Sequence, residues 1–487
     1  MNFPTATATA HLSLDKSPVG SVERTVTWLI TAWVVIVPWL IGGRFWWTQA
    51  LSTAIGALAL FLSLRLRENR RTLWRFPVFW LGLLFNAFVL CQTLNPWAEA
   101  IQRRADVYVW DLYLRNHIEW LPSGITGDYF GQSSLRMFVY WLGPWLLTCA
   151  WWTGVRRRRS GRRLALIVFL NGIITALVIY YQYIRPPTAV LGFYTDPQFQ
   201  YDLTLFRSAG FIDRNAAAVL LYLSMSAGMA VACQLQARAR KEGRDNGLTW
   251  IVLLGCLVIL GSFFVLGSRA GLFIGCAVFI VNLFVLIAAS LASGVRSPGL
   301  WVGSSVLVVG LAVMGFFLIT GKGSFTIQRM GYLAAHPEQD TRAILRQETV
   351  RMIGPHLWLG WGAGSYRYVS PSYFLADGYF HSKEAYGGLA VRTDYAHSDW
   401  LQFPMELGVI GAGIELAILL FWYGYAVKLG RRLGAEGAVI LVGCAGMLVN
   451  AAVEFPMFNG ALIVLFSLLL ASAIKTGALE PARIVRR

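Results

Sequence analysis

Residues 395–413 read YAHSDWLQFPMELGVIGAG and join a long polar segment to an apolar run. Ser398 and Asp399 favour the start of a helix, because their side chains can accept hydrogen bonds from the free N–H groups of a first turn. The stretch therefore predicts a helix that enters a membrane, with His397 just outside it at the boundary with water. An imidazole there can exchange a proton near neutral pH, as a general base must. The alternative is an interfacial histidine that only hydrogen-bonds a loop.

The composition extends this interpretation to the whole chain. Of the 487 residues, 56% are hydrophobic and 20 are tryptophan, and the mean hydropathy is +0.55. Twelve apolar segments are long enough, or nearly so, to cross about 30 Å of hydrocarbon as helices. They are residues 27–43, 47–64, 76–94, 135–153, 164–184, 215–235, 249–267, 270–291, 300–319, 403–426, 437–452 and 458–474. The sequence thus predicts an all-α polytopic membrane protein.

Basic residues are concentrated in alternate segments between these spans. The clusters lie at residues 65–75, 156–163, 238–244, 428–432 and 475–487. The positive-inside rule makes these segments cytoplasmic, with both termini inside. Most of the net charge of +17 is therefore a topology signal, and nucleic acid is not an expected partner. No cleavable signal peptide is expected, because the first residues lack an apolar core.

The spans and loops divide the chain into five parts. In order, these are a cytoplasmic tail (1–26), nine transmembrane helices (27–319), a large outer loop (320–402), three more transmembrane helices (403–474) and a second cytoplasmic tail (475–487). Two further loops, 95–134 and 185–214, are expected on the same outer face. Loops of such length usually serve function. The aromatic residues of the first are typical of a headgroup anchor, and stacking on sugar rings is the alternative.

Arginines are predicted at the outer ends of several spans. Arg269 lies in a short break between two apolar spans, where an arginine is costly unless it snorkels or has an anionic partner. Arg207 and Arg214 lie just before the sixth span, which Asn215 could cap. Arginine forks pair well with a diphosphate, whose lipid tail could stay in the bilayer. A diphosphate already leaves readily, so the remaining need is a base for an incoming hydroxyl, and His397 is available.

The large outer loop contains a predicted short helix and a glycine-rich turn. Residues 341–353 predict an amphipathic helix that ends at Gly354, with Arg342 and Arg346 on one face. The turn LGWGAGS follows at residues 359–365 and lets backbone approach a ligand or another helix closely. It lacks the spacing of a phosphate-binding GxxxxGK[ST] loop.

Four pieces of the sequence resemble the superfamily of bacterial O-antigen ligases and the related O-antigen and exopolysaccharide polymerases. They are RSAGF at 207–211 with Asn215, GSRAG at 267–271, the segment from Arg342 through GWGAGSY at 360–366, and His397 through ELGVIG at 406–411. Together they cover about residues 205–425, in the order and spacing of the family. The first third of the chain contains no such motif and is assigned by topology alone.

The resemblance implies a membrane-embedded, inverting glycosyltransferase that uses no metal or other cofactor. Its donor would be a glycan on undecaprenyl diphosphate at the periplasmic face of the bacterial inner membrane. By this analogy His397 activates the acceptor hydroxyl. Four arginines would bind the diphosphate, although one of them, Arg214, stands where the family often has proline: Arg207, Arg269, Arg214 and Arg342. Six residues would support the site: Asn215, Ser268, Asp399, Glu406, Gly362 and Gly364.

The acceptor remains open. It is the lipid A core in a ligase, a second lipid-linked repeat unit in a polymerase, and a protein hydroxyl in a protein O-oligosaccharyltransferase. The long aromatic outer loops favour a polymerase, and other polysaccharide-assembly proteins are expected partners. A flippase or transporter of lipid-linked glycans is the rival from another class, but the two halves of the chain are not visibly alike. Metal chemistry is not indicated, since no DxD occurs and the six cysteines show no ligand spacing.

Overall fold

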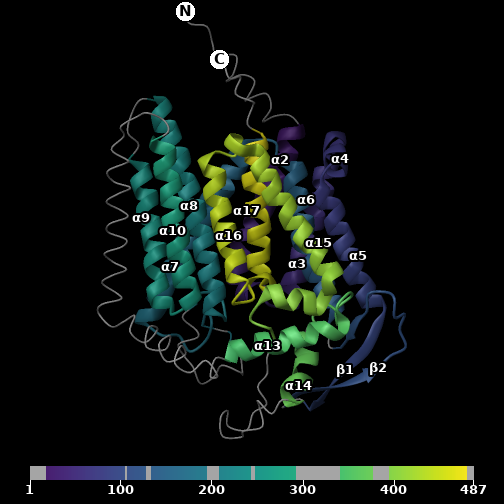
Figure 1. Cartoon of the computed structure of the whole chain (residues 1–487). Helices are drawn as coiled ribbons and strands as arrows, with labels where there is room; N and C mark the ends of the chain where they lie inside the picture. Colours follow the sequence, from purple (N-terminus) through teal and green to yellow (C-terminus); the bar gives the residue numbers. More distant parts are fainter. Residues whose placement is uncertain are drawn as a thin grey trace, which may run out of the picture.

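The structure, a computed structural model, is a bundle of long helices with a small sheet at one end (Figure 1). It describes residues 18–104, 107–127, 133–192, 194, 208–242, 247–291, 341–376 and 394–479. The helices are α2 (Pro18–Ile36), α3 (Trp46–Leu64), α4 (Arg67–Trp74), α5 (Pro77–Leu94), α6 (Ser134–Gly154), α7 (Arg158–Ile184), α8 (Arg214–Glu242), α9 (Leu248–Leu266), α10 (Arg269–Leu291), α13 (Thr341–Ile353), α14 (Tyr366–Ala376), α15 (Asp399–Leu429), α16 (Gly434–Asn450) and α17 (Gly460–Ala478).

Within the described ranges, nine helices are long and apolar enough to cross a membrane, and α16 is a shorter apolar helix. The prediction of an all-α polytopic membrane protein is confirmed. Eleven of the twelve predicted spans coincide with helices, and residues 300–319 lie outside the described part of the chain. The amphipathic helix expected at 341–353 is α13, which is followed by a 3₁₀ turn at Gly354–His356.

The first helix begins before the first predicted span. The helix α2 already begins at Pro18, inside the expected tail, and ends in two 3₁₀ turns at residues 37–43. Its polar first turns are stabilised by tertiary contacts, since the buried carboxylate of Glu23 accepts hydrogen bonds from Ser160 Oγ (2.8 Å) and the backbone N–H of Arg157 (3.0 Å). Hydropathy marks the apolar part of a helix, whereas the backbone hydrogen bonds continue beyond it.

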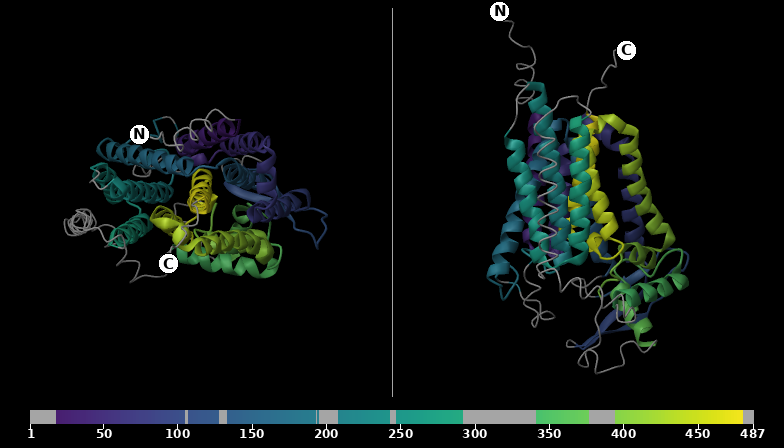
Figure 2. Two further views of the ribbon diagram at one scale, coloured as in Figure 1. Left: turned by 90° about the horizontal axis from the view of Figure 1, so that it is seen from above. Right: turned by 60° about the vertical axis from the view of Figure 1, so that its left-hand side comes forward.

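The helices form three groups from side to side (Figures 1 and 2). The helices α7 to α10 lie on one side, α16 and α17 lie in the middle, and α3 to α6 with α15 lie on the other side. The first group packs around α8, which is enclosed by α7, α9, α10 and α16. The basic segments lie at one end of the bundle, where Glu436 pairs with Arg162 at 3.1 Å.

A three-stranded sheet lies at the opposite end of the bundle, together with α13 and α14 (Figure 1). Its strands are β1 (Pro96–Arg104), β2 (Val107–Leu114) and β3 (Gly124–Thr126), in the order β2-β1-β3. The pair β1–β2 is antiparallel and β1–β3 is parallel. The loop interpretation of residues 95–134 missed these strands, although β2 reads VYVWDLYL and is rich in the β-branched and aromatic residues that favour strands.

Candidate active site

His397 lies at the junction between the outer segments and the helix bundle. It immediately precedes the N-cap of α15 and has a φ of +51°, a left-handed conformation that is uncommon for a residue other than glycine. Its ring meets the ring of Phe455 edge-on at 5.0 Å. The imidazole is partly exposed, with 30% of its side-chain surface accessible. Strained backbone at a polar, accessible histidine is typical of a functional site.

The first turn of α15 binds the loop between α16 and α17. Ser398 is the N-cap residue but makes no side-chain cap hydrogen bond. The carboxylate of Asp399 instead accepts a hydrogen bond from the N–H of Met457 (2.8 Å), and the N–H of Asp399 donates to the carbonyl of Ala451 (2.8 Å). Asp399 thus holds the loop, residues 451–459, beside the residues that follow His397.

That loop carries Glu454, a buried carboxylate with three side-chain partners. Its Oε2 lies 3.0 Å from Nδ1 of His397. Its Oε1 lies 2.6 Å from Nη2 of Arg342 and accepts a hydrogen bond from Nδ2 of Asn215 at 2.7 Å. Because a carboxylate only accepts hydrogen bonds, Nδ1 of His397 carries the hydrogen. The other ring nitrogen, Nε2, is then the one that can take a proton.

The hydrogen-bond chain continues from Glu454 toward Arg269. Asn215 Oδ1 accepts a hydrogen bond from Ser268 Oγ at 2.6 Å, and Ser268 Oγ accepts from the N–H of Gly271 at 3.0 Å. Ser268 therefore caps α10, whose first residue is Arg269. Three successive hydrogen bonds join His397 to Ser268, the residue before Arg269. The side chain of Arg269 is half-buried.

A cavity of about 390 Å³ lies beside this chain. Its lining combines the imidazole of His397 with three guanidinium and three carboxyl groups: Arg44, Arg214, Arg342, Asp213, Asp394 and Glu454. Arg269 is not among the described residues that line it. Arg207, which was predicted to bind the diphosphate, lies outside the described residues. The structure thus brings His397, Arg214, Arg342 and Asn215 together at one cavity, whereas Ser268 binds Asn215 and neither Ser268 nor Arg269 is among the described lining residues.

Asp213 has the capping role that was expected of Asn215, so that expectation was wrong. Its Oδ1 accepts a hydrogen bond from the N–H of Asn215 at 2.9 Å at the start of α8, which leaves the Asn215 amide free to bind Glu454. Burial raises the pKa of Asp213 above its ordinary value, and the nearby negative charge of Glu454 raises it further.

The cavity lining also includes Arg44 and Asp394, which the sequence analysis did not select. Asp394 lies 3.9 Å from Nη2 of Arg44 and 3.7 Å from Nε of Arg367. Arg367, on α14, lies over the ring of Trp110 on β2 at 4.5 Å. Glu454 and Asp394 were both missed. A carboxylate directly after an apolar span, on the same side as the predicted arginines, is the signal that could have identified Glu454.

The glycine-rich turn packs against Glu406. This contact, the glycine-rich joint, is separate from the cavity. The carboxylate of Glu406 is buried and accepts hydrogen bonds from the N–H groups of Gly364 (2.8 Å) and Tyr366 (3.3 Å) at the start of α14. A Cβ on Gly360 would lie 2.3 Å from the carbonyl oxygen of Glu406, and a Cβ on Gly362 would lie 2.3 Å from Cα of Gly124 on β3. The close approach that the glycines permit is therefore to α15 and the sheet.

The fold and the cavity define a multi-pass membrane protein with a histidine, arginines and buried carboxylates gathered at one end of its helix bundle. Residues 254–416 match the family model described as O-antigen ligase. This match confirms the resemblance found in the sequence and supports membership of the O-antigen ligase and polymerase superfamily. No curated protein matches the chain.

The matched region contains Arg269, Arg342 and His397, but neither Asn215 nor Glu454. The match supports an activity of the O-antigen ligase or polymerase type in general. It also implies the substrates of that family, a lipid-linked glycan and an acceptor.

Proposed function

We propose that this protein transfers a glycan from undecaprenyl diphosphate to an acceptor hydroxyl, either ligating or polymerising a polysaccharide. The observation that carries the proposal is the pairing of His397 with Glu454 at 3.0 Å, in the wall of a cavity that Arg44, Arg214 and Arg342 also line. This combination supplies a base for a nucleophile and cationic groups for a diphosphate leaving group.

In the proposed reaction, His397 Nε2 takes the proton of the acceptor hydroxyl. The acceptor oxygen attacks the anomeric carbon from the side opposite the diphosphate, so that the configuration at this carbon is inverted. The new C–O bond forms as the bond to the diphosphate breaks, and the diphosphate leaves with the electron pair. The Glu454 carboxylate fixes the Nδ1–H tautomer and stabilises the imidazolium, which later releases its proton to water.

Arginine side chains bind the departing diphosphate in this proposal. Arg214 and Arg342 line the cavity directly, and Arg269 begins the helix capped by Ser268. Arg342 also contacts Glu454, so it connects the base and the leaving group electrostatically. The expectation that no metal takes part is kept in the proposal and rests on the absence of a DxD motif from the sequence.

The proposed location is the inner membrane, with the cavity toward the periplasm and both termini in the cytoplasm. The support is the distribution of charge, because the basic segments lie at the end of the bundle opposite α13, α14 and the sheet (Figure 1). The segment 320–402 is then the large periplasmic loop. A protein acceptor, or transport of the lipid-linked glycan, is the alternative function.

Replacing His397 by alanine tests the proposal. We expect His397→Ala to lower turnover of a lipid-linked donor about a thousandfold, the contribution of a general base, while membrane insertion and thermal stability are retained. His117→Ala, which removes an exposed histidine, is the matched control. Turnover by purified His397→Ala at the rate of the control would remove this residue from catalysis.

A second test concerns donor binding. We expect Arg269→Lys to raise the KM for the donor about tenfold, because lysine cannot make the paired contact of a guanidinium fork. Arg240→Lys, near the far end of α8, is the control. An unchanged donor KM in Arg269→Lys would reject a role for Arg269 in binding the diphosphate.

A further inference from the structure

A short helix at the basic end of the bundle carries arginines on one face. This helix, α4, connects α3 to α5 at the end opposite the sheet (Figure 1). Four exposed residues follow the spacing i, i+3, i+4 and i+7 and therefore share one face: Arg67, Arg70, Arg71 and Trp74. Asn69 and Leu73 are buried and attach the other face to the bundle. The helix thus turns three guanidinium groups and one indole ring away from the protein.

The protein supplies too little negative charge for this face. The one carboxylate of α4, Glu68, is bound by Nη1 of Arg156 at 2.5 Å. The hydrogen bond and charge of Arg156 lower the pKa of Glu68, and the charge of Arg71 lowers it further. Among the described residues, the three arginines of α4 form no ion pair, and Nε of Arg70 donates to the carbonyl of Leu64 at 2.7 Å. Their guanidinium groups therefore keep donors for an external anion.

Other arginines at the same end of the bundle are neutralised inside the protein. Arg158 and Arg162 both pair with the buried carboxylate of Glu436, at 2.5 and 3.1 Å. Arg157 lies 3.4 Å from the buried carboxylate of Glu23. Either set of arginines satisfies the positive-inside rule, which depends on charge and not on its partners. Topology therefore does not explain why the arginines of α4 face outward without such partners.

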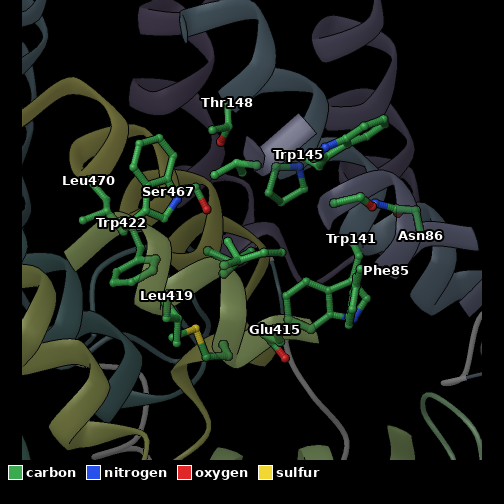
Figure 3. Close-up of a pocket in the computed structure, with 17 residues that line it drawn as sticks. Phe85, Asn86, Trp141, Trp145, Thr148, Glu415, Leu419, Trp422, Ser467 and Leu470 are labelled. Atoms are coloured by element: carbon green, nitrogen blue, oxygen red, sulfur yellow. The ribbon is translucent and has the colours of Figure 1, made fainter. Parts of the chain in front are cut away.

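Aromatic rings connect the basic face of α4 to the membrane-spanning helices. Trp74 is 59% exposed, and its ring lies 5.2 Å from that of Trp80 on α5, whose Nε1 donates to the carbonyl of Trp74 at 3.0 Å. Trp74 also meets Phe79 at 5.8 Å, and Phe79 stacks on Trp145 at 5.7 Å. Trp145 borders an apolar cavity of about 100 Å³ among α5, α6, α15 and α17 (Figure 3). Exposed indole rings that continue into apolar spans are typical of the boundary between water and lipid.

We propose that the exposed face of α4 binds the headgroup of an anionic phospholipid. The guanidinium forks of Arg67, Arg70 and Arg71 pair with the phosphate oxygens, and the ring of Trp74 packs against the glycerol and the first acyl carbons. The position of Trp74 and Trp80 at the lipid boundary favours a lipid over a soluble acidic protein. The inference goes beyond the proposed transfer reaction and does not depend on it.

Photocrosslinking of lipids to the purified full-length protein tests the location of the site. The protein is placed in phosphatidylcholine nanodiscs that contain a trace of photoactivatable phosphatidylglycerol, and the adducts are mapped by mass spectrometry of peptides. We expect adducts on residues 65–80, and about tenfold fewer there when the same photoactivatable group is carried by phosphatidylcholine, which has no net charge. An excess of soluble glycerol phosphate should leave the adducts in place, because it lacks the apolar part that Trp74 contacts.

Two triple variants that remove the same charge provide a matched pair. The first combines Arg67→Gln, Arg70→Gln and Arg71→Gln. It should lower the affinity for phosphatidylglycerol about a hundredfold, as measured by native mass spectrometry, because each basic residue near an anionic surface contributes about fivefold. The control changes three exposed basic residues at the same end of the bundle: Lys428→Gln, Arg431→Gln and Arg432→Gln. It should leave this affinity and the adducts on residues 65–80 within about twofold of wild type, if the binding is specific to α4.

A lysine variant keeps the inference testable if the glutamine variant fails to insert into the membrane. Arg67→Lys, Arg70→Lys and Arg71→Lys together preserve the charge that sets the topology but remove the planar forks. We expect normal insertion and an affinity for phosphatidylglycerol about tenfold lower than that of wild type, since lysine binds phosphate as a point charge.

Several outcomes would overturn the inference. Equal loss of affinity in the two glutamine variants, or equal adducts from the two lipids, would show a non-specific attraction without a site on α4. Competition by glycerol phosphate would identify a site for free anions instead of a lipid. An absence of adducts on residues 65–80 of the wild-type protein would exclude the lipid and leave an acidic protein as the occupant. An unchanged affinity in the lysine variant would exclude the paired guanidinium contact.

Discussion

Two buried glutamates occupy comparable positions at the same end of the bundle, yet their partners differ in kind. Glu454 is bound by side chains, those of His397, Arg342 and Asn215. Glu406 is bound by backbone N–H groups of the glycine-rich turn and by the amide of Gln402 at 2.9 Å. A carboxylate that contacts a titratable ring beside a cavity can take part in chemistry. A carboxylate that satisfies backbone donors at the start of a helix stabilises the fold.

The glycine-rich joint is expected to give the largest effect when disturbed. Gly360 has a φ of +72°, and a Cβ there would collide with the backbone of Glu406 and Gly408. Gly360→Ala should lower the free energy of unfolding by about 3–4 kcal/mol through backbone strain and overpacking. Thermal unfolding in detergent measures this loss.

Gly424→Ala provides the control for that experiment, because a Cβ at Gly424 meets no atom within 4 Å. It should change stability by at most about 1 kcal/mol, in the favourable direction of the higher helix propensity of alanine. Equal stability of the two variants would show that the joint is looser than its geometry indicates.

Exchanging each glutamate for glutamine sharpens the contrast. Glu454→Gln should lower kcat about ten- to hundredfold, because three donors lose a shared anion and each hydrogen bond to a charged group contributes about 1.5–3 kcal/mol. Glu406→Gln should instead lower the free energy of unfolding by about 1–3 kcal/mol and leave kcat per folded molecule near wild type. Turnover and thermal unfolding, measured on both variants, separate the two roles, and the same pattern in both would refute the distinction.

Asp213 gives the smallest expected effect, which depends on pH. Since burial raises its pKa in the folded protein, the folded state holds the proton more tightly than the unfolded chain does. Its favourable contribution is complete below the unfolded pKa of about 3.9 and is lost as the pH rises through the higher folded value. Asp213→Asn should therefore gain stability over wild type as the pH rises from 4 to 8, as thermal unfolding in buffered detergent would show. A difference between the two proteins that is independent of pH would contradict this account.

The predictable part of the site was the part set by local sequence. Ser398, Asp399 and the following apolar run identified the start of α15, and the four-residue spacing of Arg342 and Arg346 identified α13. The expected Asn215 cap failed for a local reason, because a carboxylate stands one position before the helix at Asp213 and takes that role. Both predictions thus depended on which of several competent side chains the surroundings select.

The glycine-rich turn shows the limit of motif reasoning. Its glycines correctly indicated a close backbone approach, but Gly362 and Gly364 bring the turn against β3 and the carboxylate of Glu406. The glycines of the turn indicate that another backbone segment can approach it closely. The packing of distant segments decides which segment that is.

By itself, the sequence determined the membrane-spanning helices, the resemblance to a superfamily and the histidine at the edge of the bundle, because hydrophobic runs, charge asymmetry and short motifs act locally. Only the tertiary structure decided that Glu454 joins His397, 57 residues earlier, to Asn215, 239 residues earlier. Hydrogen bonds between side chains so far apart depend on how the helices pack. The same packing separates Glu406 from the cavity.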